Sequence, residues 1–210
     1  MAGLLVFLGG FAIMVLEIIG ARYLAKDFGG SFYVWISQIG VILIALALGY
    51  YFGGALADRR PRMSFLTWLL VPGGIVTVLI PNFANPLINV IIMRHPTDRN
   101  IPLLWQKLDP AIGSLLIFLL PCFVLATLTP FMIRLATRRV AHVGRISGLI
   151  YAASTVGSIA GVFVSGYILV DHLKLSNIFR ATGGLTMLLG LMCCFMDRWF
   201  VAEDPKMTHI

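Results

Sequence analysis

The sequence predicts an all-α integral membrane protein with about six transmembrane helices and one short interfacial or re-entrant helix. Hydrophobic residues make up 59% of the 210 residues and charged residues only 12%, which leaves too little polar surface for a soluble domain. The charged residues fall in short clusters between long apolar runs, which reach the ~20 residues needed to cross a bilayer. Because lipid cannot hydrogen-bond to the backbone, we expect these runs to be helices.

Six of the apolar runs are long enough to span a bilayer. The expected spans cover about residues 3–23, 34–55, 63–81, 110–135, 146–170 and 175–195. Residues 85–93 form an apolar piece that is too short to span, so we expect an interfacial or re-entrant helix there. Pro121 and Pro130 should bend the fourth span, because each removes a backbone hydrogen bond. We interpret residues 1–196 as one transmembrane domain and residues 197–210 as a short polar C-terminal tail.

The net charge of +7 points to the lipid bilayer as a partner, and we expect no nucleic acid partner. Basic loops on an apolar chain usually set topology and contact anionic lipid. Positive charge is denser in residues 56–63 and 134–145 than in the loops of the opposite side, although the totals on the two sides are equal. The density favours two cytoplasmic termini in a bacterial inner membrane or an equivalent cytoplasmic membrane.

Small residues recur at helical spacing in the second and fifth spans. Gly49 and Gly53 share one helix face, and so do Gly157 and Gly161. Such residues let the backbones of membrane helices approach closely. These four helix-packing candidates fit either tight packing inside the protein or an interface that slides as the protein opens and closes.

A candidate buried polar site centres on Glu17. An ionised acid in the middle of an apolar span costs about 3 kcal/mol, so Glu17 should face protein or water and have a partner. Arg22 lies about 140° around the same helix, which permits a direct pair only if the helix unwinds near Gly20. Two interpretations stay open: a cation or proton site, or a hydrogen-bonded acid that fixes helix packing. The candidate residues are Glu17, Arg22, Gln38, Ser154, Thr155 and Ser158.

A basic turn follows the second span. Gly53 and the glycine after it precede a motif that consists of Asp58, Arg59, Arg60 and Arg62. The Asp is expected to cap the following turn, while the arginines hold the loop to the lipid surface or to helix C-termini.

No catalytic residues, metal site or cofactor are predicted. The three cysteines show no CxxC spacing. His95, His142, His172 and His209 are scattered among loops and the tail, where histidines are usually solvated.

The basic turn resembles the loop between helices two and three of the major facilitator superfamily. A six-helix chain with glycine-rich second and fifth spans would match one half of such a transporter. The resemblance implies that the first three and last three helices are related by an inverted repeat. Span two would then pair with span five.

A closer resemblance is to the membrane domain of membrane-bound spermidine synthase-like proteins, and it covers about residues 3–195. In that family an acid, an arginine and a glycine precede a tryptophan-led second span, and further glycine and proline motifs follow in order. The matching residues here are Glu17, Arg22, Gly29-Gly30-Ser31, Trp35, Leu48-Gly49-Tyr50, Gly53, Pro130, Arg134-Leu135, Gly144-Arg145, Gly148, Thr155 and Gly157-Ser158.

Members of that family often continue into an aminopropyltransferase domain with a Gly-rich nucleotide loop. This chain runs to Ile210, has nine acidic residues and shows no such loop after a strand, so we expect no enzymatic activity. The function expected instead is a non-catalytic membrane subunit, an anchor or scaffold that docks onto other membrane or soluble proteins. The alternative is a small transporter of a cation or polyamine that acts as a dimer of six-helix halves.

Overall fold

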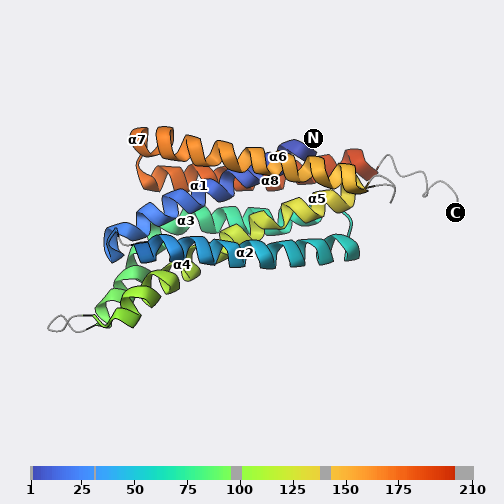
Figure 1. The fold of residues 1–210 in the computed structure, drawn as a ribbon. Coiled ribbons are helices and arrows are strands. Elements are labelled where there is room, and N and C mark those ends of the chain that lie inside the picture. Colours follow the sequence, from blue (N-terminus) through green and yellow to red (C-terminus); the bar gives the residue numbers. More distant parts are fainter. Residues whose placement is uncertain (1, 31, 96–100, 138–142, 202–210) are drawn as a thin grey trace, which may run out of the picture.

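The computed structural model describes residues 2–30, 32–95, 101–137 and 143–201, which form helices and no strands. Among these residues, six helices are long and apolar enough to cross a membrane, which confirms the predicted fold class (Figure 1). The elements are α1 (Ala2–Phe28), α2 (Phe32–Arg59), α3 (Ser64–Met93), α4 (Leu103–Ala126), α5 (Leu128–Ala136), α6 (Val143–Val164), η2 (Ser165–Leu169), α7 (Val170–His172) and α8 (Leu175–Val201).

The fourth and fifth spans are each built from more than one element. Helices α4 and α5 together form the fourth span, and α6, the π-helical turn η2 and α7 form the fifth. The start of α1 and the end of α8 lie at the same end of the bundle (Figure 1). Helix α8 continues to Val201, so the first part of the predicted tail is helical, and residues 202–210 lie outside the described residues.

The prediction of a separate short helix over residues 85–93 is wrong. This segment is the last part of α3, a single helix of 30 residues that contains Pro72, Pro81 and Pro86. Membrane helices tolerate internal prolines when neighbouring groups satisfy the freed carbonyls. At 1.5 Å per residue α3 is about 45 Å long, which exceeds the ~30 Å hydrocarbon core. Its C-terminal part and the first turns of α4 diverge together from the bundle (Figure 1).

The fourth span is interrupted at Thr127. Pro130 has no N–H to donate to the carbonyl of Ala126, four residues earlier, and the helix breaks directly after that residue. The Thr127 hydroxyl donates to the carbonyl of Val124 at 2.7 Å, and the Thr127 N–H donates to the same oxygen at 3.2 Å. The bend predicted at Pro130 is therefore a short break between α4 and α5, whereas Pro121 lies inside the continuous helix α4.

The six spans pack in three principal pairs. Helix α3 packs along α8, α1 along α6, and α2 along α4 and α5. In an inverted repeat, spans one, two and three correspond to spans four, five and six. The α1–α6 pair (spans one and five) then corresponds to the pair of the fourth span with α2, and the α3–α8 pair (spans three and six) corresponds to itself. Because equivalent helices are three places apart in the order of spans, their directions are opposite. The packing is therefore consistent with the inverted repeat expected from the sequence.

The glycine pairs of spans two and five lie at equivalent contacts. A Cβ added at Gly53 would lie 2.7 Å from the carbonyl oxygen of Thr127, and one at Gly161 would lie 2.6 Å from that of Phe11. Gly49 faces the Phe123 carbonyl and Gly157 that of Phe7 in the same way. Each pair therefore lets its helix rest directly on the backbone of α4–α5 or α1.

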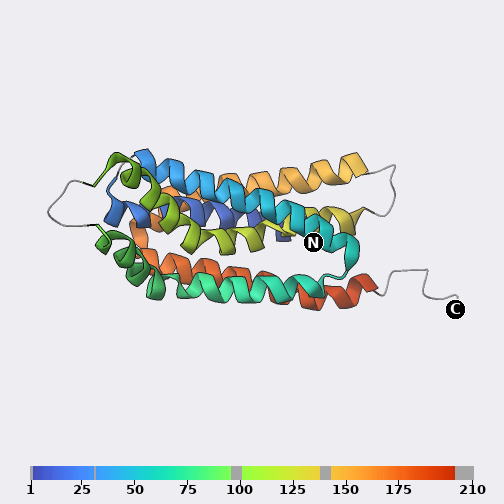
Figure 2. The ribbon, with the colours of Figure 1, turned by 90° about the horizontal axis from the view of Figure 1, so that it is seen from below.

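The third pair meets through its own glycines. A Cβ added at Gly74 of α3 would lie 2.7 Å from the carbonyl of Gly183 in α8, and a Cβ at Gly183 would lie 2.6 Å from the carbonyl of Gly74. Figure 2 shows α3 and α8 side by side along one edge of the bundle. Between the pairs, the buried Phe118 of α4 and Phe179 of α8 lie with ring centroids 5.9 Å apart, which ties α4 to α8.

We expect Gly157→Ala to destabilise the bundle by about 1–3 kcal/mol, because a methyl group would collide with the Phe7 carbonyl and force α6 away from α1. The measurement is thermal unfolding of the purified protein in mild detergent. Gly148→Ala is the matched control on the same helix, since nothing lies within 4 Å of a Cβ at that position. Equal unfolding temperatures for the two variants would contradict the close α1–α6 contact.

Candidate functional site

Helix α1 presents Glu17 between two neighbouring helices. Gly10 faces the Ser154 carbonyl and the Ser158 hydroxyl of α6, while Gly20 faces the amide of Gln38 in α2. At 100° per residue, Glu17 lies within about 20° of Gly10 and about 60° from Gly20 on the helix surface. The Glu17 side chain therefore points between α2 and α6.

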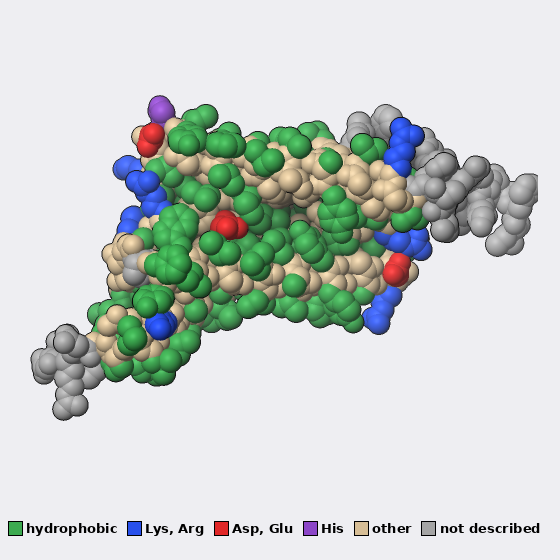
Figure 3. Space-filling model, in the orientation of Figure 1, with side chains coloured by type: hydrophobic (Ala, Val, Ile, Leu, Met, Phe, Trp, Pro, Cys, Tyr) green, Lys and Arg blue, Asp and Glu red, His purple; other side chains and the backbone are tan. Residues whose placement is uncertain are grey.

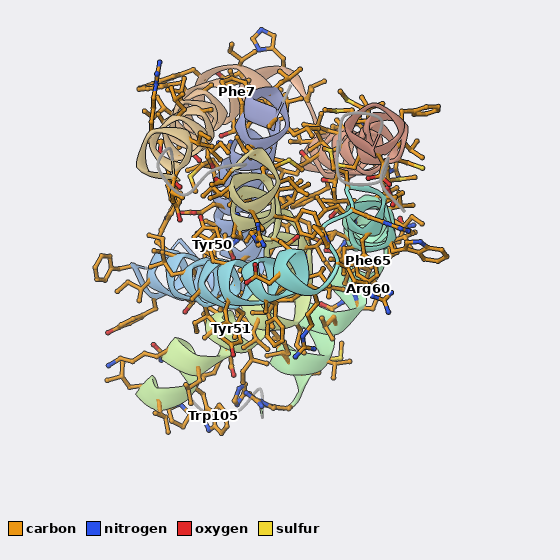
Figure 4. All side chains as sticks on the ribbon, turned by 90° about the vertical axis from the view of Figure 1, so that its right-hand side faces the viewer. Phe7, Tyr50, Tyr51, Arg60, Phe65 and Trp105 are labelled. Atoms are coloured by element: carbon orange, nitrogen blue, oxygen red, sulfur yellow. The ribbon has the colours of Figure 1, made fainter. Side chains whose placement is uncertain are left out.

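Helices α2 and α6 make few or no close contacts with each other in the described part of the chain, and Glu17 of α1, between them, is only partly buried. Tyr50 lies on the side of α2 that faces α6, whereas Tyr51 lies on the opposite side (Figure 4). Leu43 precedes Tyr50 by seven residues and so shares its face. On α6, Tyr151 and Thr155 are exposed.

We call this region the α2–α6 groove. It runs along α1, with Leu43 and Tyr50 of α2 on one wall and Tyr151 and Thr155 of α6 on the other. Glu17 of α1 lies on its floor, about three helical turns beyond the level of Thr155. Figure 3 shows the same face: an acidic side chain lies in a hollow among hydrophobic side chains, midway along the bundle. The remaining described acids lie near the ends of helices.

Glu17 lacks the partner that the sequence suggested. Its side chain is partly buried, yet it forms no hydrogen bond or ion pair with any described residue. Arg22 is exposed and does not pair with it. The carboxyl group therefore faces the open groove without a charged or hydrogen-bonded neighbour among the described side chains.

Gln38 belongs to a different contact, between α1, α2 and α4. Its side chain is fully buried and accepts a hydrogen bond of 2.7 Å from the Ser114 hydroxyl of α4. The Gln38 amide donates to the carbonyl of Leu16 in α1 at 3.5 Å. The glutamine therefore links three helices, and its partner Ser114 was not among the residues that the sequence suggested.

The three α6 hydroxyls do not lie at the level of Glu17. Gly157 lies against Phe7 and Gly161 against Phe11, so Glu17 lies about two to three helical turns beyond these hydroxyls. The Thr155 hydroxyl donates to the carbonyl of Tyr151 within its own helix at 2.9 Å. Ser154 and Ser158 are partly buried against Gly10. The structure thus separates Glu17 from the α6 hydroxyls. Gln38 bonds to the carbonyl of the adjacent Leu16 but not to the Glu17 carboxyl group, and Arg22 does not pair with it.

The basic turn joins helices and does not cap α3. Asp58 accepts a hydrogen bond of 2.7 Å from Arg134 of α5, and both side chains are exposed, so the pair contributes at most about 1 kcal/mol. The expected cap by Asp58 is wrong, because α3 begins after Met63 without a side-chain cap from that turn. The Met63 N–H instead donates to Asp197 of α8 at 2.8 Å.

The arginines of the turn are exposed at the end of the bundle where α1 begins and α8 ends. The Arg60 guanidinium lies 5.3 Å from the ring centroid of Phe65, and Figure 4 shows both side chains at this end. Arg59 and Arg62 are exposed there as well. This arrangement suits contact with lipid headgroups, as the sequence suggested.

A second polar cluster, missed by the sequence reasoning, ties the end of α3 to the start of α4. Asp109 is only 5% exposed. It pairs with Arg94 and lies 2.7 Å from the Nε2 atom of His95. The Arg94 guanidinium stacks 4.1 Å from the ring centroid of Trp105, which Figure 4 labels. The expectation of a solvated His95 is therefore wrong.

The sequence offered one weak signal for this cluster, an acid directly before Pro110 in an apolar run. Its partners, Arg94 and His95, lie across a loop whose course the sequence does not reveal. No group of three or more His, Cys, Asp or Glu side chains placed to hold a metal occurs within the described ranges. The cluster joins the end of α3 to the start of α4 through an ion pair and hydrogen bonding.

Comparisons of the chain with protein-family models, with curated proteins and with solved structures found no match. Function is therefore inferred from the side chains of the α2–α6 groove.

We expect Ser114→Ala to lower the free energy of unfolding by about 1–3 kcal/mol, because the buried Gln38 carbonyl would lose its donor. The double variant Ser114→Ala/Gln38→Leu should recover part of that loss, since it removes both polar groups. Thermal unfolding in detergent measures both effects. A double variant less stable than the sum of its single changes would contradict this account.

Proposed function

We propose that this chain is a non-catalytic integral membrane subunit, an anchor or scaffold of a larger membrane-associated assembly. The observation that carries the proposal is Glu17, a carboxyl group in the middle of a span that faces the open α2–α6 groove. A carboxyl group exposed to hydrocarbon costs about 3 kcal/mol. A protein partner in the groove would remove that penalty, so association is favoured.

The exposed surface of α6 supports the same proposal. Gly148 and Ala152 are exposed on one side of this helix, and nothing lies within 4 Å of a Cβ added at Gly148. Membrane helices associate through such small residues, because they allow close backbone contact without a hydrophobic driving force. Helix α6 thus offers an outer face on which further protein can pack.

The expected orientation and family fit this role. With both termini in the cytoplasm of a bacterial inner membrane or an equivalent, the exposed arginines near the end of α2 would face the cytoplasm. The resemblance to the membrane domain of spermidine synthase-like proteins points to a soluble partner on that side. A separate aminopropyltransferase is one such candidate.

The subunit proposal predicts a stoichiometric companion when the tagged chain is purified from its native membrane in mild detergent. The companion should be lost or reduced in the Glu17→Gln variant, because the unpaired carboxyl group favours association. Asp171→Asn is the control, since this acid is exposed at the end of α7 and lies outside the groove. A chain that elutes alone would contradict the proposal.

A second candidate is a small transporter of a cation or polyamine that acts as a dimer of six-helix halves. The observations that favour it are the acid at mid-span in an open groove and the packing consistent with an inverted repeat. In transporters built from such repeats, ion and substrate sites lie near the bilayer midplane between the repeats. Glu17 would be the ligand-binding acid.

The transporter candidate predicts polyamine counterflow in proteoliposomes of the purified chain, with a large loss of flux in Glu17→Gln. The loss is expected because the amide cannot carry the negative charge that attracts the cation. Equal flux in the wild type and the variant would remove Glu17 from the mechanism. No flux from either protein would end this candidate.

A further inference from the structure

We infer that the α2–α6 groove receives one transmembrane helix of a different polypeptide, and that this helix carries a Lys or Arg side chain at the depth of Glu17. The inference rests on the proposed subunit function and specifies the chemistry of the partner. Three features of the groove support it. Its acid has no partner among the described residues, one wall is apolar while the other carries hydroxyls, and the helix register fixes the depth of Glu17 in the membrane.

The first feature is charge. Every described Lys and Arg side chain lies near a helix end or in a loop, and none pairs with Glu17. Arg22, the nearest in sequence, points about 140° away around α1. Acidic and basic side chains inside membranes pair with one another, because both are costly when they face hydrocarbon. The groove therefore complements a cation that the described residues do not supply.

The second feature is the pair of unlike walls. On α2, Leu43 is 59% exposed and Tyr50 is 39% exposed, so this wall is apolar with one phenol. The α6 wall carries hydroxyls on Tyr151, Thr155 and Ser158, which lie about two to four helical turns nearer the start of α1 than Glu17. Lipid tails would fill the groove but offer no hydrogen bond to the carboxyl group. A helix that runs the length of the groove can place an apolar stripe against α2, a polar residue against Glu17 and other polar residues against the hydroxyls.

A second copy of this chain fits the groove less well. Two copies related by a two-fold axis would bring the same face together, and each Glu17 would then meet the other Glu17. Like charges in a medium of low dielectric repel strongly. A different polypeptide with a basic residue is therefore the occupant that the charge pattern favours.

The third feature is depth. Met14 of α1 lies against Gly161 of α6, and Gly20 lies against Gln38 of α2. Glu17 falls between these two levels, near the middle of α1 and just before the π-helical turn at Ser165. The basic residue of the partner must therefore lie near the centre of its span.

Labelled synthetic helices of about 20 Leu and Ala residues, with a single central Lys, Leu or Glu, test the inference in vesicles that contain the full chain. Energy transfer to a dye on the chain reports binding. We expect saturable binding of the Lys helix, about tenfold tighter than that of the Leu helix. Glu17→Gln should abolish this difference, and Glu17→Lys should favour the Glu helix instead.

A steric pair of variants separates the groove from the rest of the surface. Leu43→Trp should block binding of the Lys helix, whereas Leu188→Trp, at an exposed position on α8, should not. Equal binding to the wild type and Glu17→Gln, or no saturable binding, would overturn the inference. Self-association of the chain that depends on Glu17 would also overturn it, in favour of a second copy.

The outcomes distinguish this inference from the proposed function. If a companion co-purifies but the Lys helix does not bind to the groove, the subunit role is supported and the groove is not the site of the partner. If the Lys helix binds but no native companion co-purifies, the inferred binding chemistry of the groove is supported and the subunit role is contradicted.

Discussion

Close contact between helix backbones at glycines determines the rest of this structure. At Gly157 the backbone of α6 rests on the Phe7 carbonyl, and at Gly53 that of α2 approaches the Thr127 carbonyl. Inside a membrane there is no hydrophobic force to drive helices together, so dispersion and weak hydrogen bonds at such contacts supply the association. Side chains larger than hydrogen at these positions would separate the helices that they join.

The groove is a consequence of this pairing. Helix α6 is held against α1, and α2 is held against α4 and α5, so neither helix covers the strip of α1 that carries Glu17. The same geometry places Gly10 and Gly20 of α1 against different neighbours, with the acid between them. A functional surface thus arises where two tightly packed pairs stand apart, and the proposed role of the protein depends on that separation.

Much of the fold followed from elementary patterns. Long apolar runs predicted six membrane helices, because only a helix satisfies its own backbone in lipid. The separate helix over residues 85–93 was predicted wrongly, since the prolines of α3 were read as boundaries although a membrane helix tolerates them. The cap by Asp58 was also wrong, because Arg134 and Asp197, distant in sequence, take the bonds that local spacing assigned to the turn.

The sequence by itself determined the class of protein, the number of spans and the presence of one costly acid at mid-span, because these depend on local composition and length. Only the tertiary structure decided which groups meet: that Gln38 bonds to Ser114, that Asp109 collects Arg94 and His95, and that Glu17 faces an open groove. Pairing of helices depends on contacts between residues far apart in the chain, and helical periodicity defines faces without saying which faces touch.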